Sequence, residues 1–109
     1  MTDRSRMLQL NILSQLVLDT RLMSLRQAAL ARQQSLDLLA ELDLPQPDTD
    51  LPPVKAGEVA MRYQLWADQR RSEINLTLAR QTATWTEARQ EAAHAFGRDQ
   101  ALNRLIWHK

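Results

Sequence analysis

The chain has 109 residues, a formal net charge of +1 and no cysteine. The length is that of one domain, and the absence of cysteine excludes disulfides, thiol nucleophiles and thiolate metal sites. The near balance of 14 basic and 13 acidic side chains argues against broad electrostatic capture of nucleic acid or anionic lipid. Nineteen leucines, fourteen alanines and only two glycines are typical of long helices. The longest apolar run has four residues, so no transmembrane segment is expected.

A first helix is predicted over residues 3–44. Thr2 or Asp3 can cap its start, and Leu44 precedes the first proline of the chain. The positions that should face another helix step alternately by four and three residues, and only one arginine interrupts the apolar row. These positions are Leu18, Leu22, Leu25, Ala29, Arg32, Leu36 and Leu39.

A proline-rich link is predicted over residues 45–57, and a second helix over residues 58–106. The interface row of this second helix has two polar interruptions and consists of Ile74, Leu78, Gln81, Trp85, Ala88, Ala92, Ala95, Asp99, Leu102 and Ile106. The link is long enough for the second helix to fold back on the first. The expected fold is therefore all-α: a single domain, residues 1–109, in which two long helices form an antiparallel coiled-coil hairpin.

The register of this hairpin can be predicted from the position of the link. If the two helices pair symmetrically on either side of the link, the numbers of two residues that face each other should add to about 103. Leu18 then faces Trp85, and Ala29 faces Ile74. The same register sets Arg32 against Arg71, a like-charge pair. These arginines must turn outward, find an acidic neighbour, or indicate an error of a residue or two in the register.

Every aromatic residue lies in the second helix, and Tyr63, Trp66 and Trp85 are predicted to lie in the helix interface. Trp107 differs, because it lies beyond the point where the first helix obviously covers it. It belongs to an apolar end that a partner or a second copy of the chain would cover. The other members of this apolar end are Leu102, Leu105 and Ile106.

Enzymatic chemistry has little support in the sequence. Glu91 and His94 have the spacing of metal ligands on one helical face, but such a site needs a second copy of the motif, so a solvated face is the preferred interpretation. Glycines only at positions 57 and 97 exclude a phosphate-binding loop, and no serine lies in a nucleophile-elbow pattern. Gly97, inside the predicted helix, is a flexible point, a close contact or an unimportant surface residue. No catalytic residue, cofactor or metal is predicted.

Part of the second helix resembles a known family. The resemblance covers Tyr63, an amphipathic stretch containing Ile74, residues 85–89 and the closing residues 100–105. Together they resemble the C-terminal helix of the FliJ/YscO family of flagellar and type III secretion export stalk and chaperone-escort proteins. The first helix is similar to that family's N-terminal helix in its periodicity. The chain departs from the family pattern in its short length, its proline-rich link and its lightly charged surface.

The resemblance implies a cytoplasmic protein, or one peripheral at the inner membrane, that is the stalk of a hexameric export ATPase and also contacts the export gate and export chaperones. No nucleic-acid partner is expected, and the free chain is a monomer or a homodimer. The expected partner-binding residues, first at the tip and then along the sides, are Leu102, Leu105, Trp107, Arg89, Arg98 and Arg104. Two alternatives stay open: a self-associating helical adaptor or chaperone that forms a four-helix bundle, and an RNA-binding helical hairpin.

Overall fold

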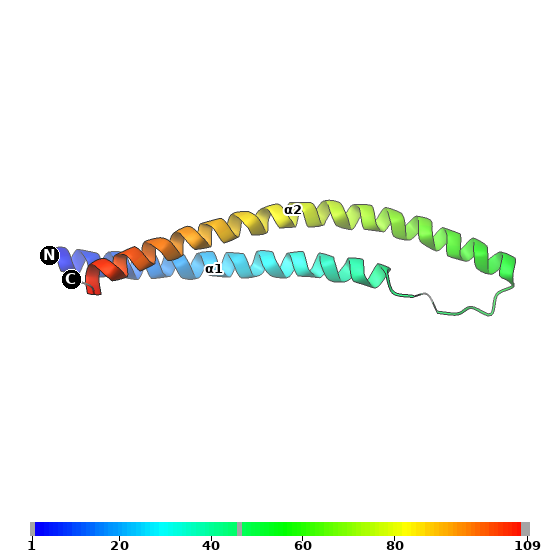
Figure 1. Ribbon diagram of the computed structural model, residues 1–109, viewed down its shortest axis with the longest axis horizontal. Helices are drawn as coiled ribbons and strands as arrows, with labels where there is room; N and C mark the ends of the chain where they lie inside the picture. The colour runs from blue at the N-terminus through cyan, green and yellow to red at the C-terminus, as the bar shows by residue number, and fades with distance from the viewer. Residues whose placement is uncertain (1, 46, 108–109) are drawn as a thin grey trace.

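The computed structural model describes residues 2–45 and 47–107 and contains two long helices (Figure 1). Helix α1 spans Asp3–Leu42 and helix α2 spans Pro53–Trp107. The helices run antiparallel, so the start of α1 and the end of α2 meet at one end of a rod of 84 × 21 × 19 Å. The predicted all-α helical hairpin is confirmed. Neither described helix contains a stretch apolar enough to span a bilayer.

Helix α1 begins where it was predicted to begin and ends two residues early. Thr2 caps its start, because its side-chain oxygen accepts a 3.1 Å hydrogen bond from the backbone N–H of Ser5. At the other end, the backbone N–H of Asp43 donates to the carbonyl of Ala40 at 3.1 Å. The helix stops before Leu44 because a residue that precedes a proline disfavours the helical conformation.

Helix α2 begins five residues earlier than predicted, at Pro53. Proline suits the first position of a helix, because its φ angle is already helical and an N–H at that position would have no partner. Gly57, which was predicted to lie in the link, is therefore inside α2. The observed link comprises residues 43–52, and α2 ends one residue beyond its predicted end.

The register differs from the predicted one by about ten residues, which corresponds to a displacement of about 15 Å along the helix axis. The predicted contacts of Leu18 with Trp85 and of Ala29 with Ile74 are therefore wrong. Hydrogen bonds between the two sides of the hairpin define the observed register, and in three of them the residue numbers add to 113 to 116. These three join Ser14 to Asp99 at 2.8 Å, Ser35 to Gln81 at 2.6 Å and Arg71 to Asp43 at 3.1 Å.

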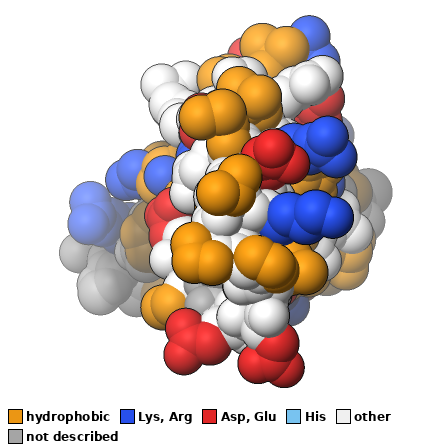
Figure 2. Space-filling model, turned by 90° about the vertical axis from the view of Figure 1, so that its right-hand side faces the viewer, with side chains coloured by type: hydrophobic (Ala, Val, Ile, Leu, Met, Phe, Trp, Pro, Cys, Tyr) orange, Lys and Arg blue, Asp and Glu red, His pale blue; other side chains and the backbone are white. Residues whose placement is uncertain are grey.

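The shift arises because α2 projects past the C-terminal end of α1. The predicted register assumed that α1 ends level with the start of α2. Instead, the link continues beyond the end of α1 before it reaches the start of α2 (Figure 1). Ten extended residues span up to about 33 Å, which is enough for this path. Seen from this end, the molecule exposes hydrophobic side chains between charged groups (Figure 2). Exposed apolar residues in the first part of α2 include Val54, Val59, Met61 and Leu65.

The interface row of α2 is confirmed, and that of α1 is confirmed at five of its seven positions. On α2, the buried residues of the predicted row are Ile74, Ala88, Ala92, Ala95, Asp99 and Ile106, and Ala67 joins them. On α1, the buried residues are Asn11, Ala28, Ser35 and Leu42. Of the predicted α1 row, Leu22 and Ala29 are exposed, and the half-buried members are Leu18, Leu25, Arg32, Leu36 and Leu39. The buried Asn11 and Ser35 make the α1 side of the interface more polar than the predicted row.

The predicted like-charge pair of Arg32 and Arg71 does not form. The guanidinium carbon of Arg32 lies 5.0 Å from the ring centre of Trp85, in a cation–π contact. Arg71 instead connects the end of α1 to α2. Its guanidinium donates to Asp43 at 3.1 Å and to Asp68 at 2.9 Å.

The core of the hairpin is narrow and rich in alanine. Its best-buried cluster joins Leu42, Ala67 and Ile74, and Ala67 has no exposed surface. Among the described residues, no large side chain is fully buried. Since hydrophobic stabilisation scales with the apolar area removed from water, a core of this kind stabilises the fold only modestly.

Candidate functional site

A groove near the terminal end of the hairpin contains two of the predicted partner-binding residues. Arg98 and Leu102 line it from α2, and its volume is about 200 Å³. The other lining residues are Leu10, Leu13, Ser14, Val17 and Ala95. The groove therefore offers a partner a largely apolar surface that is bordered by one cation.

The spacing of residues on each helix explains how the groove forms. Leu10, Leu13 and Val17 are three and four residues apart, so they share one side of α1. Ala95, Arg98 and Leu102 are three and four residues apart, so they share one side of α2. Of these lining residues, Arg98 and Leu102 were predicted from the sequence as partner-binding residues, and those of α1 were not. The available signal was the spacing of the three exposed apolar residues on α1.

Buried polar side chains lie next to the groove. Ser14 Oγ contacts two acceptors, Asp99 Oδ1 at 2.8 Å and the backbone carbonyl of Asn11 at 2.9 Å. Asn103 Nδ2 donates to the other oxygen of Asp99 at 3.3 Å. The side-chain oxygen of Asn11 is buried and has no hydrogen-bond partner within residues 2–45 and 47–107. These contacts fix the two helices relative to each other where the groove is formed.

Glu91 and His94 lie beside a second, smaller cavity of about 90 Å³. Glu91 forms an ion pair with Arg21 across the helix interface, with 3.1 Å between Arg21 Nη1 and Glu91 Oε2. The described part of the chain contains no group of three or more His, Cys, Asp or Glu residues that could hold a metal. The contact between Glu91 and Arg21 gives this glutamate a structural role in the hairpin.

Arg89 is separate from the groove. Its guanidinium carbon lies 4.8 Å from the ring centre of Trp85, which also contacts Arg32. Arg89 and Arg98 are nine residues apart, or about 14 Å along the helix axis. Trp85 is half-buried, as expected for a residue of the interface row.

The predicted apolar tip is partly covered by α1. The guanidinium carbon of Arg4 lies 5.7 Å from the ring centre of Trp107, so the first turn of α1 reaches this tryptophan. The expectation that Trp107 lies beyond the first helix is wrong, because it depended on the incorrect register. Trp107 is nevertheless 63% exposed, and Arg104 is exposed in the last turn of α2.

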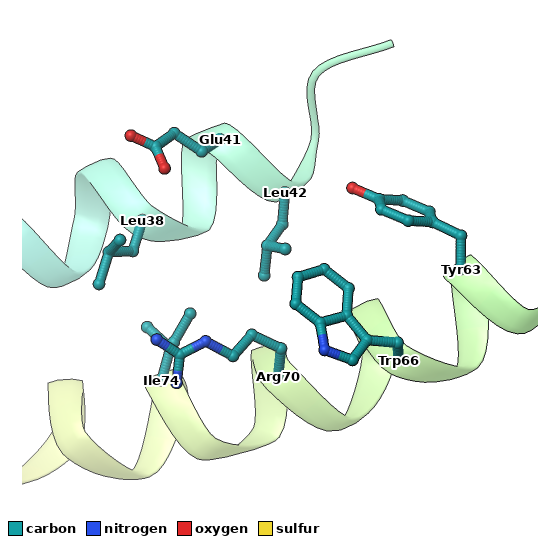
Figure 3. A pocket seen from close by; sticks show the side chains of 7 residues that line it. All are labelled: Leu38, Glu41, Leu42, Tyr63, Trp66, Arg70 and Ile74. Carbon is teal, nitrogen blue, oxygen red and sulfur yellow. The ribbon is translucent and has the colours of Figure 1, made fainter. Parts of the chain in front are cut away.

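Another hollow lies far from the terminal groove, where α1 ends (Figure 3). Its volume is about 270 Å³, and its lining residues are Leu38, Glu41, Leu42, Tyr63, Trp66, Arg70 and Ile74. The rings of Tyr63 and Trp66 lie 5.6 Å apart. Tyr63 is half-buried, but Trp66 is 55% exposed, so the prediction that Trp66 belongs to the interface is wrong.

No protein-family model, no curated protein and no solved structure matches the chain. Its function is therefore inferred from its own residues. The features that bear on function are the terminal groove, the hollow at the end of α1 and the apolar residues that both helices expose.

Proposed function

We propose that the chain is a non-enzymatic coiled-coil component of a flagellar or type III protein-export apparatus, where it is the stalk of the hexameric export ATPase and an escort for export chaperones. One support is the resemblance of α2 to the FliJ/YscO family. The observation that supports this function best is a rod of 84 × 21 × 19 Å with an apolar groove near one end.

A rod of this shape can influence a ring of subunits without chemistry of its own. When an asymmetric rod occupies the centre of a ring, each subunit meets a different side of it. If the rod binds one conformation of a subunit more tightly than another, it shifts that subunit toward the conformation that it binds more tightly. Rod binding is thereby coupled to the hydrolysis cycle. Leu102 and Leu105 supply apolar contacts, and Arg98 and Arg104 supply contacts to acidic surfaces.

We assign the ATPase contact to the terminal end of the hairpin. The groove residues Arg98 and Leu102 lie there, next to the exposed Leu105 and Trp107. Arg89 lies farther along the rod, against Trp85, and would contact the side of the ring. The exposed face and the projecting start of α2 would be left for the export gate and the export chaperones.

The experiment that tests this function is recovery of partners from the native cell. The tagged full chain is captured from its own lysate at two salt concentrations, and bound proteins are identified by mass spectrometry. Recovery of the export ATPase or a gate component supports the stalk role. Recovery of only the chain itself supports the self-associating adaptor. Recovery of RNA, with binding that falls steeply as salt rises, supports the RNA-binding hairpin. Cell fractionation tests the cytoplasmic or inner-membrane location.

A pair of matched variants tests the assigned surface. Leu105→Asp should reduce recovery of the ATPase at least tenfold, because it places a charge in an apolar contact. Leu76→Asp is the control, since Leu76 is also more than half exposed on α2 but lies far from the terminal end. Circular dichroism should show equal helicity in both variants. Equal recovery of the ATPase by both would remove Leu105 from the interface.

A further inference from the structure

The side of α1 that faces away from α2 carries a second coiled-coil row. Each residue of this row comes two residues after an interface position such as Asn11, Ser14 or Ala28. Two residues correspond to a rotation of about 200° around the helix, so the row lies on the side opposite the interface. Its members alternate in steps of three and four residues, which is the spacing of a seam between helices. The row consists of Leu13, Leu16, Thr20, Met23, Gln27 and Leu30. Its four large apolar members are 57% to 61% exposed.

Charged residues at both ends of this row have opposite signs. Arg6 lies seven residues before Leu13, and Asp37 lies seven residues after Leu30, so both continue the row. The separation of Arg6 and Asp37 corresponds to about 46 Å of helix. An antiparallel copy of the same row would therefore bring the basic end of one helix to the acidic end of the other.

The match between two antiparallel copies extends through the whole row. Facing residues then have numbers that add to 43, so Arg6 of each copy meets Asp37 of the other. The central layers of this arrangement pair Leu13 with Leu30, Leu16 with Gln27 and Thr20 with Met23, so each layer contains at least one large apolar side chain. A pairing in which each contact occurs twice has the two-fold symmetry typical of homodimers.

A second charge pair flanks the row. Asp19 and Arg26 directly precede Thr20 and Gln27, and in the same arrangement Asp19 of each copy lies beside Arg26 of the other. Within residues 2–45 and 47–107, the side chains of Arg6, Asp19 and Arg26 take part in no ion pair and no side-chain hydrogen bond. Parallel pairing would instead set Arg6 against Arg6 and Asp37 against Asp37, and it would not bring Asp19 and Arg26 together.

We propose that this face of α1 binds a second copy of the chain, with the two α1 helices antiparallel about a two-fold axis between Thr20 and Met23. The charge pattern is what favours a second copy, because the same face supplies both members of each ion pair. Arg98, Leu102 and Leu105 lie on α2, outside the proposed contact. The proposed dimer row shares Leu13 with the terminal groove, but the dimer can be tested without any export protein.

Charge reversal tests the proposed dimer in the full chain. Light scattering and sedimentation should give the wild type a mass of twice 12.6 kDa at micromolar concentration. Asp19→Arg and Arg26→Glu should each weaken dimerisation at least tenfold, because each sets like charges together at two places. An equimolar mixture of the two variants should recover the dimer, since opposite charges again meet at both places. The double variant D19R/R26E should also dimerise.

The opposite results would overturn the proposal. They are a wild type that stays monomeric at all concentrations tested, single variants that dimerise as tightly as the wild type, or a mixture that stays monomeric. Leu16→Glu should abolish the dimer, whereas Leu76→Glu should leave it unchanged, and both leucines are 57% exposed. Equal helicity by circular dichroism in all variants shows that the hairpin itself has not unfolded.

Disulfide trapping tests the antiparallel orientation, and the chain has no cysteine of its own. Leu13→Cys and Leu30→Cys are prepared as separate variants. The antiparallel arrangement predicts that the two variants form a covalent dimer efficiently only when mixed, because position 13 of one copy faces position 30 of the other. Efficient covalent dimers of either variant alone would indicate parallel pairing and would contradict the proposed axis.

Discussion

Ser14 of α1 donates a 2.8 Å hydrogen bond to Asp99 of α2 across the helix interface. Asp99 is buried at a position that usually holds an apolar side chain in a coiled coil. Its second oxygen accepts a hydrogen bond from Asn103 at 3.3 Å. A buried carboxylate without partners is costly, so this contact disfavours any register in which Asp99 would face an apolar residue.

Ser14→Ala should lower the free energy of unfolding by about 1 to 3 kcal/mol, because Asp99 loses its partner from the opposite helix while it stays buried. Urea titration followed by circular dichroism measures the change. Thr84→Ala is the control, since the Thr84 hydroxyl only bonds back to the Arg80 carbonyl on an exposed surface. The control should lose no stability. If both variants lost the same free energy of unfolding, the hydrogen bond to Asp99 would contribute no more to stability than the exposed one of Thr84.

Replacing Asn11 by an apolar residue should raise the stability, in contrast to the loss expected for Ser14→Ala. Asn11 is buried at an interface position of α1, and its Oδ1 has no hydrogen-bond partner in the described part of the chain. A buried acceptor of this kind costs about 1 to 3 kcal/mol. Asn11→Leu removes that cost and adds apolar burial, so Tm should rise, whereas Asn11→Asp should lower it. A lower Tm for Asn11→Leu would mean that the amide makes a stabilising contact, for example to water.

The helices could be predicted because their sequences are long and periodic. The row of α2 from Ile74 to Ile106 follows from steps of three and four residues alone, and the prolines divide the two helices. The register could not be predicted in this way, because several shifts along the axis bring apolar rows together. Polar contacts such as the one between Ser35 and Gln81 distinguish these shifts, and they are known only once the helices are placed.

In the candidate site, too, the residues of a single helix could be predicted, whereas features that depend on the register could not. Arg98 and Leu102 were predicted from α2 alone and both line the groove. The α1 side of the groove, for example Leu10, depends on the register and was missed. Trp107 was assigned to an uncovered tip because the predicted register ended α1 too early along α2, whereas Arg4 contacts it. An error in the register of the two helices thus gave the wrong neighbours for residues far from the link.

Introduced cysteines can test the register directly. Ser35→Cys combined with Gln81→Cys should form an intramolecular disulfide, because these side chains face each other at 2.6 Å between their oxygen atoms. Leu18→Cys combined with Trp85→Cys should not, since these residues face each other only in the register predicted from the sequence. Mobility under non-reducing conditions, with dilute protein, detects the product. Cross-linking of the second pair alone would restore the predicted register.

Gly97→Ala should stabilise the hairpin by about 1 kcal/mol, because glycine is the poorer helix former and this position lies inside α2. A Cβ atom at Gly97 would meet no heavy atom within 4 Å, so the substitution causes no clash. Of the three interpretations of this glycine, the close contact is therefore wrong. Gly57→Ala is a useful comparison. Gly57 is equally open but lies in the projecting part of α2, where local fraying should make the gain in Tm smaller.

Arg71 holds the end of α1 against α2. Its guanidinium donates to Asp43 and Asp68 and also reaches the backbone carbonyl of Leu42 at 3.4 Å. Arg71→Ala should therefore release the last turn of α1, at a cost of about 1 kcal/mol, and amides of residues 39–43 should exchange hydrogen faster by up to about tenfold. Arg70→Ala is the matched control, because among the described residues Arg70 forms an ion pair only with Glu73, on its own helix. If both variants exchange at the same rate, the end of α1 is held by the burial of Leu42 rather than by Arg71.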